Sequence, residues 1–322
     1  MSEELMDTYD VVVIGGGPAG LNAALMLARS RRSVLVIEAG SPRNGLAEGM
    51  HGLLGHDGTP PSELLGRGRE EVRRYGGQLS SGEVVGAQRH DENFMVILRD
   101  GRTTQARRIL VTIGVVDELP DLEGVRARWG HDVLHCPYCH GWEVRDQAIG
   151  VLASGPRSVH QALLFRQQTD DILYFTHTLM PQPDDAEKLT ARGIEQVDGN
   201  VDRLEIEQGR LAGVRMRDGR VFPRQALVVA TRLVVSAPFL TELGLNPAEH
   251  PSGLGQHIPV EPTGRTAVAG VWAAGNVTDP SAQVGSSAAA GAMTAAQINA
   301  DLVEEDTQRA IASRDLVGPI ET

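Results

Sequence analysis

The chain has 322 residues, of which 41% are hydrophobic and 22% charged, and a formal net charge of −12 at pH 7. This length predicts two compact domains, since one core usually serves about 100–200 residues, and the composition excludes a disordered chain. The negative charge argues against a nucleic-acid partner, and no apolar run approaches the roughly 20 residues that span a bilayer.

The first predicted elements form a strand-helix-strand unit. Residues 9–14 are a short apolar run that predicts a buried parallel strand. Small apolar residues then recur at helical spacing over 21–28, and residues 34–37 predict the next strand. Such a unit is typical of a doubly wound α/β sheet that binds a dinucleotide.

A glycine fingerprint lies between the first strand and the helix. Gly15, Gly17 and Gly20 occupy the first, third and sixth positions of GGGPAG. The first glycine permits a tight turn, the second lets a pyrophosphate approach, and the third lets the helix pack on the strand. Glu38 ends the next strand, where a carboxylate accepts hydrogen bonds from a ribose. The strand before the glycines, the helix after them and the carboxylate of Glu38 together make the prediction of a dinucleotide-binding site specific.

The remaining elements suggest that this plan occurs twice. A Gly- and Pro-rich loop over 40–61 is expected to line the cofactor. In chain order we then predict a helix at 62–75, strands at 83–88, 94–98 and 109–113, a second unit of strand 148–153 and helix 159–168, strands at 172–175, 211–216, 226–230 and 271–276, and a helix at 286–299.

The chain has only two cysteines, Cys136 and Cys139, in the sequence CPYC. The polar start of the chain, residues 1–10, is unlike a signal peptide, so we expect a cytoplasmic protein, in a compartment where structural disulfides are rare. Zinc is disfavoured, because His135, Cys136, Cys139 and His140 lie too close together in sequence to form a tetrahedron. We therefore expect a redox-active pair and no metal.

A cysteine pair of this kind needs a two-electron partner and a base. A neighbouring flavin accepts an electron pair, and an imidazole accepts the thiol proton near neutral pH. His140 is the adjacent candidate, and the sequence leaves open whether His135 shares the task. His51 and His56 are candidates to border the flavin or the dithiol site.

Four segments together resemble the low-molecular-weight thioredoxin reductase family: residues 15–20, Thr112 to Gly114, the cysteine pair and residues 270–280. The resemblance implies FAD, a homodimer and an α/β fold of two Rossmann-like (doubly wound, three-layer) domains of the pyridine nucleotide-disulfide oxidoreductase class II type. It also implies an FAD-binding domain made of residues 1–117 and 246–322, with an inserted NAD(P)H-type domain, 118–245, that carries the CxxC.

By this resemblance Cys139 faces the flavin and Cys136 meets the substrate. Asn276 stands where the family has Asp, and its amide can still bond the ribityl chain. The implied FAD-binding residues are Gly15, Gly17, Pro18, Ala19, Gly20, Glu38, Ala39, Asn44, Thr112, Gly114, Gly275, Asn276, Gln283 and Val284.

The inserted segment departs from the family in three places. The second glycine fingerprint reads Ala153 to Ser158 and lacks its first glycine. The His-Arg-Arg run that clamps the NADPH 2′-phosphate reads His177-Thr178-Leu179, and no spacing argument lets Arg157 or Arg192 replace it. The residue after the second cysteine is His140 instead of Asp.

These departures resemble the thioredoxin reductase-like dithiol oxidases that close disulfides in gliotoxin- and dithiolopyrrolone-type natural products. The resemblance implies FAD-dependent oxidation of a small-molecule dithiol, with O2 as acceptor and H2O2 as product, in biosynthesis or self-protection. Two alternatives stay open: a reductase of a thioredoxin-like protein supplied by NADPH or ferredoxin, and a flavin-bound redox sensor without turnover.

Overall fold

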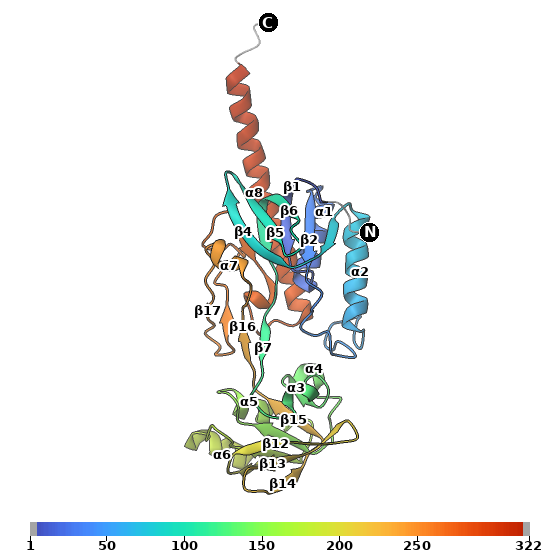
Figure 1. Ribbon diagram of the computed structural model, residues 1–322, viewed down its shortest axis with the longest axis vertical. Helices are drawn as coiled ribbons and strands as arrows, with labels where there is room; N and C mark the ends of the chain where they lie inside the picture. The colour runs from blue at the N-terminus through green and yellow to red at the C-terminus, as the bar shows by residue number, and fades with distance from the viewer. Residues whose placement is uncertain (1–4, 318–322) are drawn as a thin grey trace.

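Two sheets form separate halves of the molecule, one above the other in Figure 1, and a narrow pair of strands joins them. The computed structural model describes residues 5–317. Residues 1–4 and 318–322 lie outside the described part. They belong to the polar start of the chain and to the end of the predicted FAD-domain segment 246–322.

The first sheet combines the two ends of the described chain. Its order is β3-β2-β1-β6-β5-β4, and β19 also pairs with β6. The β4–β5 and β5–β6 pairs are antiparallel and the other pairs are parallel. The strands are β1 (Thr8–Ile14), β2 (Val34–Glu38), β3 (Gln78–Ser81), β4 (Val84–His90), β5 (Asn93–Leu98), β6 (Thr103–Val111) and β19 (Val271–Ala273).

Alternation along β1 separates the two cores of this sheet. Val11 and Val13 pack beneath α1 (Pro18–Arg29), α2 (Pro61–Arg74) and α8 (Val284–Val317), whereas Val12 and Ile14 face the opposite side. That second core includes α7 (Phe239–Glu242), and the hairpin β17 (Ala248–Glu249) and β18 (Gln256–His257) lies in the same stretch of chain. Successive strand residues point to opposite faces, so an uninterrupted apolar strand predicts layers on both sides.

The second sheet is parallel, in the order β11-β10-β9-β15-β8. Helices α5 and α6 contribute to the core on one face, and an antiparallel sheet of β12, β13 and β14 covers the other. The elements are α3 (Val125–Arg128), β8 (Val133–Leu134), α4 (Pro137–His140), β9 (Ile149–Leu152), α5 (Ser158–Phe165), β10 (Ile172–Phe175), α6 (Pro183–Ala191), β11 (Glu195–Val197), β12 (Val201–Glu207), β13 (Arg210–Met216), β14 (Val221–Pro223) and β15 (Ala226–Val229). The predicted α/β fold of two doubly wound, three-layer halves is confirmed.

The connection between the halves consists of β7 (Val116–Glu118) and β16 (Arg232–Val234), which pair antiparallel. Beyond β16 the chain packs on the first sheet, because Phe239, Leu240 and Leu245 belong to its core. The predicted boundary at 245 therefore falls inside the first half. We propose an inserted domain of 118–234, flanked by two segments of the FAD domain.

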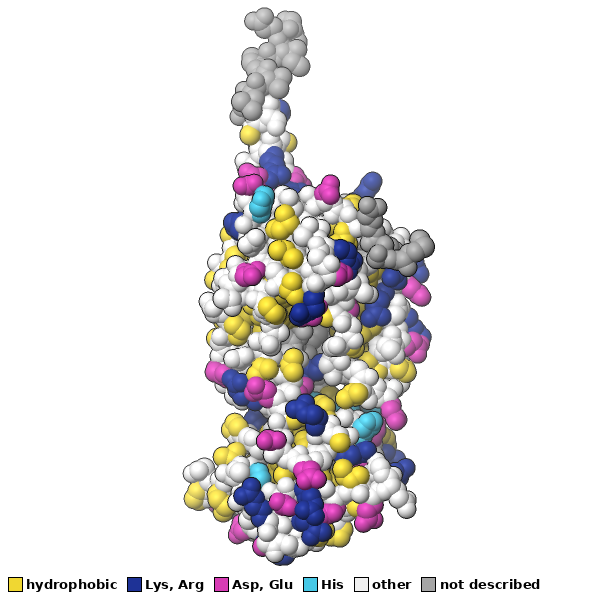
Figure 2. Space-filling model, in the orientation of Figure 1, with side chains coloured by type: hydrophobic (Ala, Val, Ile, Leu, Met, Phe, Trp, Pro, Cys, Tyr) yellow, Lys and Arg dark blue, Asp and Glu magenta, His cyan; other side chains and the backbone are white. Residues whose placement is uncertain are grey.

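Helix α8 is much longer than the predicted 286–299 and extends beyond the body of the first half (Figure 1). No helix in residues 5–317 is long and apolar enough to cross a membrane. On the face shown in Figure 2, acidic and basic side chains are interspersed over both halves.

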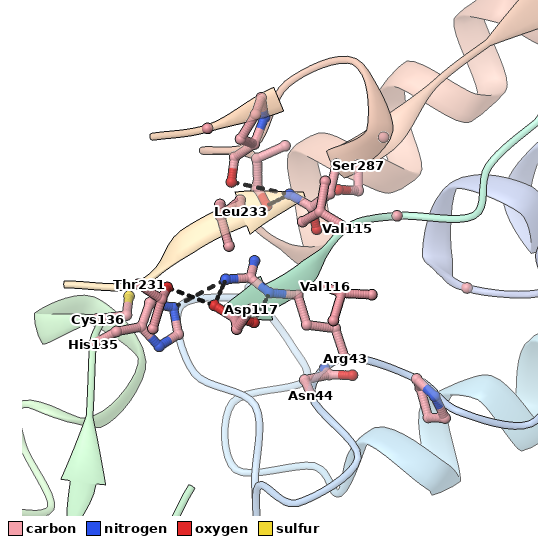
Figure 3. Close-up of a pocket in the computed structure, with 18 of the residues that line it drawn as sticks. Arg43, Asn44, Val115, Val116, Asp117, His135, Cys136, Thr231, Leu233 and Ser287 are labelled. Atoms are coloured by element: carbon pink, nitrogen blue, oxygen red, sulfur yellow. Dashed lines mark hydrogen bonds and ion pairs between the residues drawn. The ribbon is translucent and has the colours of Figure 1, made fainter. Parts of the chain in front are cut away.

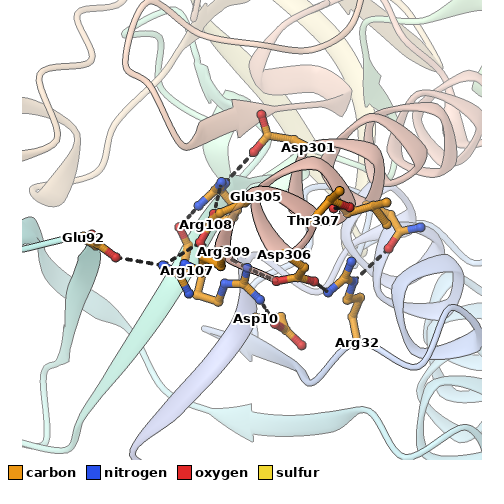
Figure 4. A network of polar contacts seen from close by, with 12 residues as sticks. Asp10, Arg32, Glu92, Arg107, Arg108, Asp301, Glu305, Asp306, Thr307 and Arg309 are labelled. Carbon is orange, nitrogen blue, oxygen red and sulfur yellow. Dashed lines mark hydrogen bonds and ion pairs between the residues drawn. The ribbon is translucent and has the colours of Figure 1, made fainter. Parts of the chain in front are cut away.

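A network of ion pairs anchors α8 to the first sheet (Figure 4). Arg107 and Arg108 lie on β6 and both contact Glu305 of the helix. Arg108 also pairs with Asp301 at 2.7 Å, and Arg32 pairs with Asp306 at 2.7 Å. Burial raises the pKa of Glu305, but the charges and hydrogen bonds of Arg108 and Arg107 outweigh burial and lower it.

Replacing Glu305 by Gln is expected to lower the free energy of unfolding at pH 7 by about 1–2 kcal/mol, because Arg107, Arg108 and Arg309 each lose a charged partner. A carboxyl group with a depressed pKa stabilises the fold above its ordinary pKa, and this contribution is lost as the pH falls. The difference in free energy of unfolding between the two proteins should therefore narrow below pH 4.5, the ordinary pKa of a glutamate side chain. Denaturant unfolding of the two proteins across pH measures it. Glu304→Gln is the matched control, since Glu304 is exposed and bonds only Gln308 among the described contacts.

Candidate active site

A cavity of about 1060 Å³ lies where the two halves meet. One wall is formed by residues at the carboxyl ends of β1, β2 and β6, the edge at which parallel sheets bind their ligands. The facing wall comes from the inserted half and includes the CxxC and the start of α5. Segments far apart in the sequence thus converge on one site.

The glycine turn after β1 leaves space for a phosphate. Gly15 has a φ of +109°, and a Cβ on Gly20 would collide with the Gly15 carbonyl and the Thr112 hydroxyl. Thr112 fixes the turn by donating its hydroxyl hydrogen to the Gly15 carbonyl at 2.8 Å. Nothing lies within 4 Å of where a Cβ on Gly17 would stand, and Gly17 lines the cavity beside the start of α1. Free N–H groups at a helix start suit a pyrophosphate.

Glu38 holds the same loops from the end of β2. Its carboxylate accepts hydrogen bonds from the backbone N–H of Gly16 and, at 2.7 Å, of Gly40. Glu38 also lines the cavity, so its remaining lone pairs can accept ribose hydroxyls. The turn and this carboxylate fit the adenosine half of FAD.

Most of the predicted FAD residues lie around this cavity. Gly20 lies behind the turn and acts through packing. The amide nitrogen of Asn276 donates to the carbonyls of Asp279 and Ala282, at 3.1 and 2.7 Å, which leaves its oxygen for a ribityl hydroxyl. The cavity-lining residues of the predicted set are Gly15, Gly17, Pro18, Ala19, Glu38, Ala39, Asn44, Thr112, Gly114, Gly275, Asn276, Gln283 and Val284.

The two cysteines face the same cavity and are joined as a disulfide. Cys136 precedes the short helix α4, and Cys139 lies within it, with the two Cα atoms 5.3 Å apart. A proline at the start of α4 fits the helix because the first N–H groups have no partner in the helix. The CxxC therefore lies in the wall of the cavity that the FAD motif opens into.

His140 lies half-buried beside the pair. Both of its ring nitrogens are shielded from solvent and lack a hydrogen bond among the described residues. Burial lowers its pKa, Glu143 opposes that shift, and His51 adds to it. Leaving a buried polar group unpaired costs about 1–3 kcal/mol, so such a group calls for a functional explanation. A neutral imidazole next to a disulfide is ready to accept the proton of an incoming thiol.

A model of the pyridine nucleotide-disulphide oxidoreductase family matches residues 9–297 of the chain. The chain belongs to this family. It is a thioredoxin reductase-like flavoprotein enzyme with FAD as its cofactor, as the resemblance implied.

Similar proteins support this assignment. The crystal structure of HlmI is 44% identical, covers 97% of this chain and 98% of its own, and superposes with a TM-score of 0.90. Thioredoxin reductase sirT of Leptosphaeria maculans is 29% identical over 86% of this chain and 89% of its own length. Thioredoxin reductase tcpT of Claviceps purpurea is 37% identical over 50% of this chain, which spans 52% of that protein, about half its length.

A polar junction beside the disulfide was not predicted from the sequence; it consists of Arg43, Asp117, His135 and Thr231 (Figure 3). Arg43, from the loop after β2, donates to both carboxylate oxygens of Asp117 on β7, at 2.6 and 2.9 Å. Thr231, just before β16, donates to the same carboxylate at 2.7 Å. The Arg43 Nη2 nitrogen, which bonds Asp117, also contacts His135 Nε2 at 3.4 Å. No local sequence signal pairs residues from four separate segments.

The other two candidate histidines differ in position. His51 lines the cavity, and its ring nitrogens lie 3.4 Å from carboxylate oxygens of Asp57 and Glu143. The Glu143 contact joins the loop after β2 to the segment that follows the CxxC. His56 does not line the cavity, so only His51 is brought to the predicted site.

The turn after β9, at the position of the second fingerprint, is closed by its own side chains. The Ser158 hydroxyl oxygen accepts hydrogen bonds from the backbone N–H groups of Ser154 and Gly155, each at 3.2 Å. The Ser154 hydroxyl in turn bonds the carbonyl of Ala230 at 3.0 Å and accepts its N–H at 2.9 Å. His177, at the position of the 2′-phosphate clamp, accepts the Val201 N–H at 3.0 Å. These groups already have partners within the chain.

Proposed function

We propose that this oxidoreductase converts a small-molecule dithiol into an intramolecular disulfide and passes the electrons to O2. The observation that carries the proposal is the closed turn after β9. Its two N–H groups bond Ser158, so a pyrophosphate entering there would first have to displace an internal partner. In the proposal the electrons enter through the cysteine pair, which lines the cavity.

The residues around the disulfide can carry out the exchange. A substrate thiolate attacks Cys136, the sulfur–sulfur bond breaks, and Cys139 leaves as a thiolate. The second substrate thiol then attacks the mixed disulfide, which releases the oxidised substrate and Cys136. His140 accepts the proton of the incoming thiol and returns it to the leaving sulfur.

The overall reaction balances as dithiol plus O2 giving disulfide plus H2O2. FAD, when bound, would supply the acceptor for the two electrons that the cysteines give up as they return to a disulfide, with O2 as the final acceptor. The turn residues, Glu38 and Asn276 hold this cofactor in the proposal. We further propose a homodimer and a role in natural-product biosynthesis or self-protection, on the resemblance to dithiol oxidases.

Reduction of a thioredoxin-like protein is the second candidate. The names of the curated relatives, thioredoxin reductases sirT and tcpT, favour it. It requires NADPH or ferredoxin as donor. The internal bonds of Ser158 and His177 argue against the NADPH route.

Oxygen uptake tests the proposed function. The purified holoenzyme is expected to consume O2 on addition of dithiothreitol alone and to form one H2O2 for each dithiol oxidised. Glutathione, a monothiol, is the control, because it cannot close an intramolecular disulfide. Uptake that occurs only after NADPH or ferredoxin is added would support the reductase instead.

A further inference from the structure

His135 stands directly before Cys136, and its surroundings are different from those of His140. Its ring stacks on Trp129, with 5.4 Å between centroids and 28° between planes. The Gln161 amide donates to the His135 carbonyl at 2.7 Å and so fixes the backbone before the disulfide. The charged and titratable groups that face the ring are Arg43, Asp117 and His140.

Arg43 decides which nitrogen of His135 carries a proton. A guanidinium group has only donors, so the His135 Nε2 that faces it at 3.4 Å has to offer its lone pair. A neutral ring then carries its hydrogen on Nδ1. Protonating Nε2 would place two cations in contact in a half-buried junction, where screening by water is weak.

Asp117 keeps Arg43 in this position. Both of its carboxylate oxygens bond the guanidinium, and only 7% of its side chain is exposed. Thr231 donates to the same carboxylate and ties it to the second connecting segment. Burial raises the pKa of Asp117, but the hydrogen bonds and charge of Arg43 outweigh burial and lower it, so the carboxylate stays ionised.

We propose that Arg43 is a positioning residue that keeps His135 a neutral Nδ1–H imidazole unable to accept a proton. Of the two histidines that flank the cysteine pair, only His140 can then move protons for it. This consequence rests on the proposed function, whereas the state of His135 does not. Burial, together with the charge of Arg43, lowers the pKa of His135 to about 4, against the opposing effect of Asp117.

Nitrogen-15 spectra of histidine side chains test the proposal without turnover. We expect the His135 ring of the wild-type holoenzyme to show Nδ1–H and an unprotonated Nε2, with no titration between pH 5.5 and 8.5. The signal is assigned by its loss in His135→Gln. Titration of His135 near neutral pH, or a proton on Nε2, would overturn the proposal even if dithiol oxidation were confirmed.

A variant gives the second arm of the test. In Arg43→Met the repelling cation is gone and Asp117 remains, so the pKa of His135 should rise toward its ordinary 6.5. The pH profile of anaerobic flavin reduction by dithiothreitol should then show an additional titration near that pH. This titration should be absent in Arg43→Met/His135→Gln. Arg43→Lys, which keeps a cation, should restore a His135 ring that does not titrate between pH 5.5 and 8.5.

Arg145→Met, which removes an arginine that stacks on Trp142 at 4.2 Å, is the matched control and should leave the His135 signal unchanged. A His135 signal that is the same in Arg43→Met and wild type would contradict the role of Arg43.

Discussion

Replacing Cys139 by Ser is expected to abolish reduction of the flavin by dithiols, with a loss of at least about 1,000-fold in rate. Serine cannot form the disulfide with Cys136 that accepts the substrate's electrons. Stopped-flow absorbance of the visible flavin band after anaerobic mixing with dithiothreitol measures the rate. Tyr138→Phe is the matched control, because it changes a residue between the two sulfurs, keeps the ring, and should retain the wild-type rate.

The same variant distinguishes the roles of the two cysteines. With Cys139 as the leaving sulfur, a free Cys136 in Cys139→Ser should trap an oxidised substrate analogue as a mixed disulfide, which intact-protein mass spectrometry detects. Trapping should be absent in Cys136→Ser if Cys139 faces away from the substrate. Wild-type flavin reduction in Cys139→Ser would support a flavin-bound sensor, in which the pair takes no part in turnover.

Replacing His140 by Gln is expected to lower the rate of flavin reduction by about 100-fold at pH 7, the lower end of the range for general acid–base catalysis. Glutamine removes a proton acceptor beside the pair whose ring nitrogens have no partner among the described residues. The deficit should narrow as the pH approaches the ordinary thiol pKa of about 8.5, since the substrate then ionises by itself. Stopped-flow rates across pH measure both effects.

The wild-type pH profile carries a related expectation. Because burial lowers the pKa of His140, its neutral form persists below pH 6.5, and the acid decline in rate should begin below that value. His135→Gln is the matched control and should have a much smaller effect than His140→Gln. Equal losses in both variants would assign the proton to both histidines.

The strand-helix-strand start of the first half was predicted well because its signals are local. Gly15, Gly20 and Glu38 lie within one strand-helix-strand unit, and each acts through its own backbone or the adjacent loop. The cysteine pair is equally local, with both sulfurs on one short helix and its preceding residue. Elements with strong apolar runs, such as β9 and β15, were placed within one or two residues.

Long-range contacts explain what was missed. The extension of α8 is polar, and ion pairs with Arg107 and Arg108 of β6, about 200 residues earlier in the chain, hold its middle. We propose 234 instead of 245 as the end of the inserted domain, because α7 packs on the first sheet after the chain has returned through β16. The sequence revealed the lost glycine at Ala153, but not that Ser158 bonds the N–H groups of the turn.

Anaerobic reduction by a small dithiol and by NADPH, side by side, tests most directly whether electrons enter through the cysteine pair without nicotinamide. We predict that one equivalent of dithiothreitol bleaches the flavin of the holoenzyme, while the same amount of NADPH leaves its spectrum unchanged. Complete bleaching by NADPH, with a flavin that does not respond to the dithiol, would contradict the proposed function.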